Sequence, residues 1–254
     1  MYRFYVEAEK ITKPVISITG ADVNHIKNVL RMRIGEELTV CDGAGMEYHC
    51  RILELASDVV QAEVLEDRPS DTELPVRLVL FQGLPKKDKM ELIVQKAVEL
   101  GAAEIVPVMM HRTVVKLEDP KKEAKKLERW QAIAEAAAKQ SMRGVIPRVL
   151  PVMSYAQAIE RAKQMDAAVL PYEHAEGIEG SRRLVQSLKG KQEIGIFIGP
   201  EGGFEDAEVE KAREAGIWPM TLGKRILRTE TAGLAILSIL MFELEQGAEG
   251  KEQA

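Results

Sequence analysis

Two glycine-containing loops, Gly199–Gly203 and Gly223–Arg228, carry the residues best suited to hold a ligand. The first follows the apolar, strand-like run Ile194–Ile198 and precedes acidic residues that favour a helix N-terminus. The second follows the strand-like run Trp218–Leu222 and precedes a long apolar helix, whose expected start at Thr229–Ala232 offers a threonine cap. Glycine permits positive φ and a close approach of the main chain, so amide and carbonyl groups can recognise the ligand. We therefore expect both loops to line one site.

Common nucleotide-binding signatures do not account for these loops. Gly199, Gly202 and Gly203 are spaced G-x-x-G-G, so the dinucleotide fingerprint G-x-G-x-x-G is absent. A P-loop is absent too, because Arg225 stands where a serine or threonine would hold magnesium. Steric needs alone also place glycines in strand-to-helix turns, and this simpler interpretation stays open for each loop taken singly.

The two loop segments nevertheless resemble a known pair of motifs. Ile198–Phe204 (IGPEGGF) and Leu222–Ala232 (LGKRILRTETA) are similar, in this order, to motifs of the ribosomal RNA small subunit methyltransferase E (RsmE) family. That family belongs to the SPOUT class of S-adenosylmethionine-dependent RNA methyltransferases. Upstream segments at His25–Arg33, Gln95–Val108 and Glu128–Arg143 are also similar, so the resemblance spans nearly the whole chain.

The resemblance implies an enzyme of ribosome biogenesis. It would transfer the methyl group of S-adenosylmethionine to N3 of a uridine in 16S ribosomal RNA near the decoding site, giving 3-methyluridine. The partners implied are 16S ribosomal RNA or the small ribosomal subunit, and a second copy of the chain in a homodimer. Two alternatives stay open from the residues: another nucleotide-binding α/β enzyme, and a non-catalytic RNA-binding or ribosome-assembly protein.

The resemblance also implies which residues form the site. Arg228 and Glu201 are the catalytic candidates, through charge handling beside the base. The residues expected around the cofactor come from three chain segments: Leu170, Gly199, Pro200, Glu201, Gly202, Gly203, Leu222, Gly223, Ile226, Leu227, Arg228, Glu230 and Thr231. A local ion pair at a helix start is the alternative for Arg228 with Glu230, and Ile226 and Leu227 could instead belong to the core.

The elements that must position these loops form a larger second domain, expected at 75–250. From Val76 onward, strand-like runs alternate with helical runs, which is the pattern of a parallel sheet covered by helices on both faces. Ser154 is the expected cap of a helix at Tyr155–Gln164. Periodicity gives no reason to propose a knot. The SPOUT resemblance does imply a C-terminal trefoil knot whose loops form the methyl-donor site.

Residues 1–70 have the pattern of a small β domain. Short strand-like runs surround one expected helix at Ala21–Leu30, and a polar stretch with a proline, Arg68–Thr72, marks the boundary. This agrees with the PUA-like β-barrel that the resemblance implies. Lys27 and Arg31 share one face of the expected helix. We expect RNA contacts at Arg3, His25, Lys27, Arg31, Arg33 and Arg143, the alternative being a solvated face paired with Glu36 and Glu37.

Composition sets the remaining expectations. The net charge of −5 disfavours a nucleic-acid partner at first sight, but the distribution of charge matters more than its sum. Cys41 and Cys50 lack metal-ligand spacing and are expected to be reduced structural thiols, and the four histidines likewise lack metal spacing. No apolar run reaches the length of about 20 residues that a membrane span needs. We expect a cytoplasmic protein without a metal.

Overall fold

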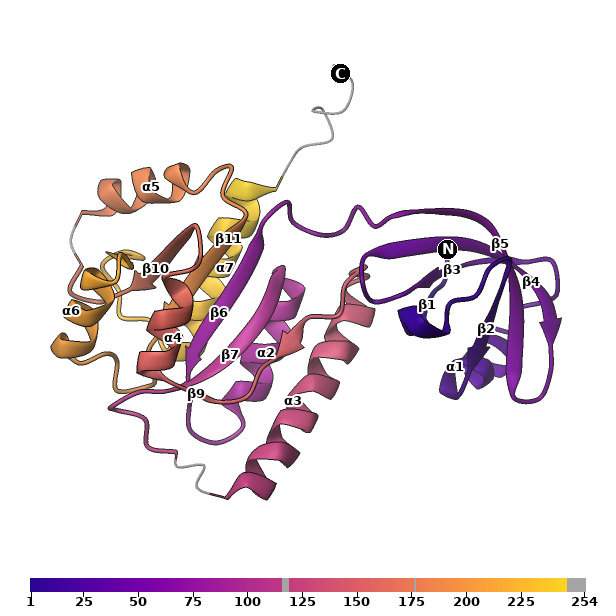
Figure 1. The fold of residues 1–254 in the computed structure, drawn as a ribbon, viewed down its shortest axis with the longest axis horizontal. Helices are drawn as coiled ribbons and strands as arrows, with labels where there is room; N and C mark the ends of the chain where they lie inside the picture. The colour runs from indigo at the N-terminus through magenta and orange to yellow at the C-terminus, as the bar shows by residue number, and fades with distance from the viewer. Residues whose placement is uncertain (116–118, 176, 246–254) are drawn as a thin grey trace, which may run out of the picture. The chain divides into compact units, whose positions relative to one another are not determined.

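The computed structural model describes residues 1–115, 119–175 and 177–245. Its contacts divide the chain into two compact units (Figure 1). The first comprises Met1–Glu73 together with Ala138–Ile146, and the second comprises Leu74–Ala137 and the described residues from Pro147 onward. Residues 138–146 thus join the first unit in space, although the sequence analysis placed them in the second domain. The predicted end of that domain at 250 lies outside the described residues.

Within the described residues, the first unit forms a mixed five-stranded sheet in the order β1-β3-β4-β5-β2. Its strands are β1 (Arg3–Tyr5), β2 (Val15–Thr19), β3 (Glu37–Cys41), β4 (Met46–Leu55) and β5 (Val59–Pro69). β1 pairs with β3 in parallel, and the other pairs are antiparallel. Because β1 and β2 stand at the two ends of this order, the described strands make a half-barrel rather than a closed barrel.

Alternation along the strands builds the core of this unit. Ile16 and Ile18 on β2, and Leu38 and Val40 on β3, are fully or almost fully buried, as expected where successive strand side chains point to opposite faces. Cys41 and Cys50 are both free and buried. Burial raises the pKa of each thiol to about 11, so both stay protonated and act as packing groups at neutral pH.

The expected helix at Ala21–Leu30 is only partly α-helical. α1 covers Ala21–Asn24, and a π-helical turn continues from His25 to Val29. The buried side chain of Ile26 anchors the turn, and Arg31 follows with a φ of 56°. Since a non-glycine residue with positive φ is uncommon, this segment is locally strained, and lysine and arginine spacing read from a regular helix does not apply to it.

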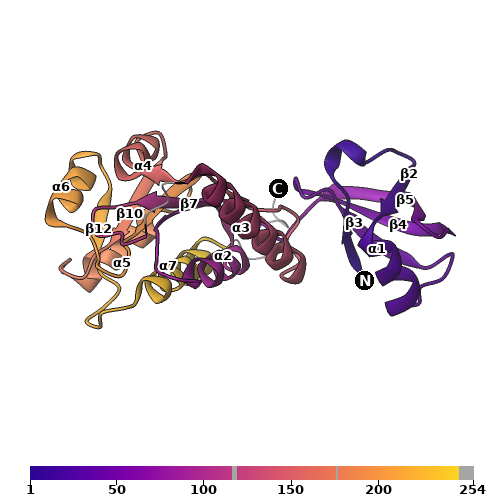
Figure 2. The same cartoon turned by 90° about the horizontal axis from the view of Figure 1, so that it is seen from below.

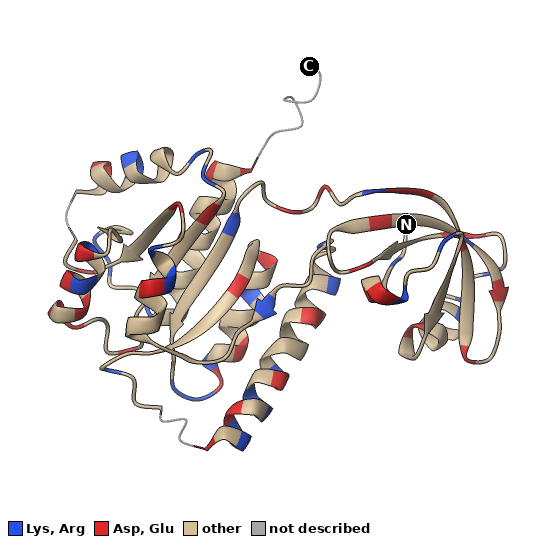
Figure 3. Ribbon diagram, in the orientation of Figure 1, with Lys and Arg blue, Asp and Glu red and all other residues tan. Residues whose placement is uncertain are grey.

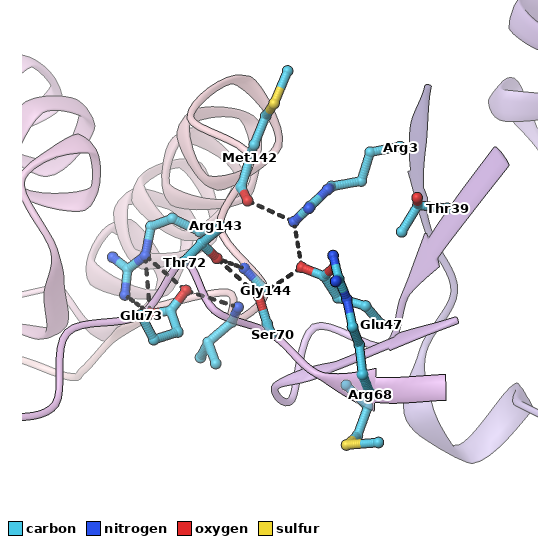
Figure 4. A network of polar contacts seen from close by, with 12 residues as sticks. Arg3, Thr39, Glu47, Arg68, Ser70, Thr72, Glu73, Met142, Arg143 and Gly144 are labelled. Atoms are coloured by element: carbon cyan, nitrogen blue, oxygen red, sulfur yellow. Dashed lines mark hydrogen bonds and ion pairs between the residues drawn. The ribbon is translucent and has the colours of Figure 1, made fainter. Parts of the chain in front are cut away.

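Polar contacts fasten residues 138–146 to the rest of the first unit (Figure 4). Arg3 Nη1 donates to the Met142 carbonyl at 2.7 Å and forms an ion pair with Glu47 at 2.9 Å. The Arg143 guanidinium pairs with Glu73, and the side chain of Arg143 is 6% exposed. The segment is therefore a structural part of the β unit.

The second unit is organised around a parallel sheet of seven strands among the described residues. The order is β12-β10-β11-β6-β7-β8, and β9 also pairs with β7. Their bounds are β6 (Arg77–Gly83), β7 (Ala102–Met109), β8 (Arg148–Val149), β9 (Met153–Ser154), β10 (Ala167–Pro171), β11 (Glu193–Ile198) and β12 (Trp218–Met220). The central strands are buried on both faces, which explains their continuous apolar sequences.

Helices cover both faces of this sheet, with α4 and α6 on one face and α2 and α7 on the other (Figure 2). The helices from α2 onward are α2 (Lys89–Glu99), α3 (Pro120–Gln140), α4 (Tyr155–Ala162), α5 (Ile178–Ser187), α6 (Asp206–Glu214) and α7 (Thr229–Leu244). The predicted Ser154 cap of α4 is confirmed, because Ser154 Oγ accepts from Gln157 N at 3.3 Å. The predicted parallel α/β architecture is confirmed, and the trefoil knot stays a prediction.

Candidate active site

A cavity of about 390 Å³ opens where β10, β11 and β12 end and α7 begins. The carboxyl ends of parallel strands are the usual place for a ligand in an open α/β sheet. Both glycine loops reach it, together with residues from α2, β10 and α7: Lys89, Pro171, Tyr172, Glu173, Ile198, Gly199, Pro200, Glu201, Gly203, Phe204, Thr221, Leu222, Gly223, Arg225, Ile226, Leu227, Arg228, Thr229 and Ala232. The expectation of one site between two loops therefore agrees with the geometry.

The first loop turns tightly at the end of β11. Gly203 has a φ of 68°, and its N–H donates to the Pro200 carbonyl at 2.9 Å. Gly202 differs from its neighbours, because it does not line the cavity and a Cβ built on it would lie 3.0 Å from Cβ of Arg112. Arg112 Nη1 also donates to the Gly202 carbonyl at 2.8 Å, so this glycine serves packing behind the loop rather than ligand space.

The second loop projects outward from two fixed ends. Gly223 has a φ of 116°, and its N–H donates to Thr221 Oγ1 at 3.1 Å. A Cβ built on Gly223 would have no heavy atom within 4 Å, so the glycine leaves open space at the cavity wall. Beyond it, Ile226 is 81% exposed.

A chain of buried hydrogen bonds joins the two loops. Gln82 Nε2, on β6, donates to Thr229 Oγ1 at 2.9 Å, and Thr229 Oγ1 donates to the Gly199 carbonyl at 2.6 Å. The predicted threonine cap is wrong here, because Arg228 is the N-cap of α7 and makes no side-chain cap bond. The Thr229 hydroxyl instead connects the start of α7 to the end of β11.

An ion bridge joins the loops a second time. Lys89 Nζ lies 3.2 Å from Glu201 Oε1 and 3.3 Å from Glu230 Oε2. The hydrogen bond to Glu201 is the largest cause that raises the Lys89 pKa above its ordinary value. Partial burial raises the Glu201 pKa, but bonds from Lys86 N–H and Lys89 outweigh it, so the Glu201 pKa is lowered. Lys89 therefore stays cationic and Glu201 anionic near neutral pH.

Some residues expected around the cofactor lie outside the cavity lining. Leu170 is fully buried in the core, and the next residue, Pro171, lines the cavity instead. Glu230 reaches the site through Lys89, and Thr231 is exposed beyond the lining. Ile226 is mostly exposed rather than a core residue, which removes that alternative.

The sequence analysis missed several residues that line the cavity. Lys89 lies more than a hundred positions before the loops, in a lysine-rich stretch without a spacing signal. Tyr172 and Glu173 follow β10, and their place after a strand end was the one available clue. Arg225 was inside a quoted motif without an assigned role, Thr221 stood in the strand-like run before it, and Thr229 was expected only as a helix cap.

The residues expected to contact RNA fall into two groups, those with exposed side chains and those whose side chains are engaged in contacts within the protein. His25, Arg31 and Arg33 are exposed on the β unit. Lys27 Nζ donates to the Ala56 carbonyl, and Arg3 and Arg143 are held in the contacts described above (Figure 4). Along α3, basic and acidic residues are interspersed, as in a solvated helix face (Figure 3).

Among the described residues, no three His, Cys, Asp or Glu side chains gather where they could hold a metal ion. Within the same ranges, no helix combines the length and apolar character needed to cross a membrane.

Comparisons with known proteins agree along nearly the whole chain. Residues 72–241 match the family of RNA methyltransferase domains, and residues 18–65 match the RNA methyltransferase PUA domain. The protein named ribosomal RNA small subunit methyltransferase E from Bacillus subtilis (strain 168) is 41% identical over 251 residues, covering 96% of this chain and 98% of that protein. The protein of the same name from Mesomycoplasma hyopneumoniae (strain 232) is 33% identical, covering 94% and 98%.

Solved structures give the same result. A ribosomal RNA small subunit methyltransferase E from Neisseria gonorrhoeae, bound to S-adenosyl methionine, matches with a TM-score of 0.78 at 34% identity, covering 95% of this chain and 97% of that chain. A protein described only as hypothetical matches with a TM-score of 0.83 at 41% identity, covering 96% and 98%. Fold and site thus define an RNA methyltransferase of the SPOUT class with a PUA domain. The chain belongs to the ribosomal RNA small subunit methyltransferase E family.

Proposed function

We propose that this protein transfers a methyl group from S-adenosylmethionine to N3 of a uridine in 16S ribosomal RNA, near the decoding site, giving 3-methyluridine. The observation that carries the proposal is the cavity between the two glycine loops, in a chain 34% identical to a relative whose structure holds S-adenosyl methionine. We further propose that the protein acts in the cytoplasm and that its catalytic domain contains the trefoil knot of its class.

The cavity fits the methyl donor. Its volume lies within the range of about 300 to 1,000 Å³ that is usual for small-molecule sites. Ile198, Phe204, Leu222, Leu227 and Ala232 supply apolar wall suited to an adenine ring. The open space beside Gly223 lets a ligand approach the main chain. Donors and acceptors of the two loops can then bind the polar edges of the ligand.

S-adenosylmethionine, when bound, supplies an activated methyl group, so the protein has to supply geometry and remove one proton. Alignment of reactants reaches effective molarities of roughly 10⁵ to 10⁸ M, whereas a general base contributes about 10² to 10⁴-fold. Positioning should therefore dominate. The two connections between the loops, through Thr229 and through Lys89, fix that geometry.

Arg228 and Glu201 take different parts in this proposal. As uridine N3 loses its proton, negative charge develops on the uracil oxygens, and the exposed Arg228 guanidinium at the cavity is placed to stabilise it. Glu201 has a lowered pKa, so it is a weak proton acceptor. We therefore assign Glu201 to orienting Lys89 and the loop, and we assign the proton to solvent.

The PUA unit would dock the RNA. His25, Arg31 and Arg33 are exposed on the strained segment that follows α1, beside the exposed apolar side chains of Val29 and Ile34. Cations bind phosphates, and exposed apolar groups can pack on unstacked bases. Arg3, Lys27 and Arg143 stabilise the fold of the PUA unit through their hydrogen bonds and ion pairs within it.

We also propose a homodimer. On α7, Ile239 is 39% exposed and Phe242 is 81% exposed, and such apolar surface is suited to a second copy of the chain. A particle mass of two chains in light scattering at micromolar concentration is expected, and the mass of one chain would contradict the dimer.

Ligand binding tests the enzyme class. A thermal-shift screen of S-adenosylmethionine, S-adenosylhomocysteine, ATP and NAD should show stabilisation by the first two alone, because a ligand at 100 times its Kd stabilises by about 2.7 kcal/mol. Stabilisation by ATP or NAD instead would indicate another nucleotide-binding enzyme. Stabilisation by RNA but by none of these ligands would indicate a non-catalytic RNA-binding protein.

A further inference from the structure

The second glycine loop, which we call the basic loop (Gly223–Arg228), concentrates positive charge at the mouth of the cavity. Lys224, Arg225 and Arg228 are all exposed, and the loop contains no acidic residue. Within the part of the chain that the structure describes, none of the three forms an ion pair. The loop therefore presents three cations that have no direct ion-pair partner among the described residues.

Nearby carboxylates offset only part of this charge. Glu201 and Glu230 are both held by Lys89, at 3.2 and 3.3 Å. Glu173 is the other carboxylate of the cavity lining, and its single negative charge leaves the positive charge of the loop in excess. Exposed cations without partners at a concave site favour an anionic ligand.

The methyl donor is a poor electrostatic match for the loop. S-adenosylmethionine carries a sulfonium, an ammonium and one carboxylate, so its net charge is positive and it offers a single anionic group. The excess positive charge of the loop attracts such a cation less than it attracts a polyanion. A chain of phosphates is a better match, because each guanidinium can bind one phosphate through two parallel hydrogen bonds.

Ile226 adds a second kind of contact. Its side chain lines the cavity, is 81% exposed and stands between the cations of the loop. An aliphatic side chain flanked by cations suits a nucleotide, which joins a phosphate to an apolar sugar and base face.

The loop is fixed at both ends while its middle is exposed. Thr221 Oγ1 accepts from Gly223 N at 3.1 Å, and Thr229 Oγ1 donates to the Gly199 carbonyl at 2.6 Å. Such anchoring reduces the entropy lost when the loop binds. The loop is thus a prearranged surface rather than a free segment.

We propose that the basic loop is a second RNA site, which holds the strand on either side of the target nucleotide. Lys224 and Arg225 bind backbone phosphates, Ile226 packs against a ribose or base, and Arg228 faces the target base. This inference rests on the proposed function and adds a substrate contact within the catalytic unit, separate from the docking residues of the PUA unit.

Equilibrium binding to a small-subunit ribosomal RNA transcript, across a salt series, tests the proposal. Lys224→Gln with Arg225→Gln should weaken binding and reduce the slope of log affinity against log salt by about 1.5 units, since each phosphate contact contributes roughly 0.7 to 0.9. The matched control, Arg183→Gln with Lys191→Gln, removes the same charge from exposed positions outside the cavity lining and should leave the slope unchanged. Ile226→Ser should weaken RNA binding without changing the slope.

Calorimetric titration with S-adenosylhomocysteine separates RNA contact from donor contact. The Lys224 and Arg225 double variant should bind this ligand as well as the wild type does. Loss of S-adenosylhomocysteine binding with full RNA affinity would overturn the proposal and assign the loop to the donor. Salt slopes equal to the control would overturn it as well, with the proposed function intact. If the wild type bound neither the transcript nor S-adenosylhomocysteine, the proposed function would fail first.

Discussion

Thr229 Oγ1 donates a hydrogen bond of 2.6 Å to the carbonyl of Gly199, and this bond joins the start of α7 to the end of β11. Gln82 Nε2 on β6 donates to the same hydroxyl at 2.9 Å. Three segments far apart in sequence therefore fix one relationship between the two glycine loops. Because positioning dominates the expected catalysis, this buried chain is central to the account.

Thr229→Val should weaken both the fold and the donor site. Valine matches threonine in shape but leaves the Gly199 carbonyl and Gln82 Nε2 without this partner, and an unsatisfied buried polar group costs about 1 to 3 kcal/mol. We expect a lower urea midpoint and weaker S-adenosylhomocysteine binding in calorimetry. Thr229→Ser keeps the hydroxyl and should retain the affinity. Equal binding by the valine variant and the wild type would remove this bond from the account.

Acid should abolish the stabilisation that Lys89 provides. The Glu201 pKa is lowered, so its ion pair stabilises the fold above the unfolded pKa of about 4.3, and this contribution is lost as pH falls through the folded pKa. We predict that Lys89→Met lowers the urea midpoint at pH 7, that this difference shrinks as pH falls below about 4.3, and that it vanishes below the lowered pKa of Glu201. A difference independent of pH would contradict the ion bridge. Lys96→Met, on the same helix and paired with Glu99, controls for loss of a partly exposed, paired lysine.

Much of the fold could be predicted because its pattern is local. Buried parallel strands are continuous apolar runs, and the glycine loops stand where those runs end. The Ser154 cap needed only a serine three residues before a glutamine. Each of these features is encoded within about ten residues of sequence, as helix and strand signals usually are.

Contacts between distant segments were not predictable in the same way. Residues 138–146 look in sequence like the end of a long helix, and only Tyr5, Glu73 and their neighbours show that the segment belongs to the β unit. Gln82 and Lys89 carry no motif, because one polar side chain on a strand or helix has many possible partners. Gly202 was expected to face the ligand like its neighbours, and only the position of Arg112 shows otherwise.

Gly223→Val should abolish donor binding. Its φ of 116° disfavours a branched side chain, and the added atoms would enter open space at the cavity wall. Gly190→Val is a matched control, since Gly190 has a φ of 81° and lies outside the cavity lining. In calorimetric titration with S-adenosylmethionine, we expect binding by the control alone. Undiminished binding by the Gly223 variant would exclude this loop from the donor site.

Arg31→Gln with Arg33→Gln should weaken docking of RNA and not donor binding. Both side chains are exposed on the PUA unit, and if each contacts one phosphate the salt slope should fall by about 1 to 2 units. Filter binding with a small-subunit RNA transcript measures this slope. Lys10→Gln with Arg51→Gln removes the same charge from exposed ion pairs of the same unit and should have no effect. Equal slopes in the two double variants would place the docking surface elsewhere.

Analysis of the methylated nucleoside tests the central claim most directly. Small ribosomal subunits that lack the modification would be incubated with the protein and methyl-labelled S-adenosylmethionine, digested to nucleosides and separated by mass spectrometry. The account predicts labelled 3-methyluridine from 16S ribosomal RNA, with the label lost when Gly223→Val replaces the wild-type protein. Label in a different nucleoside, or no label despite S-adenosylmethionine binding, would contradict it.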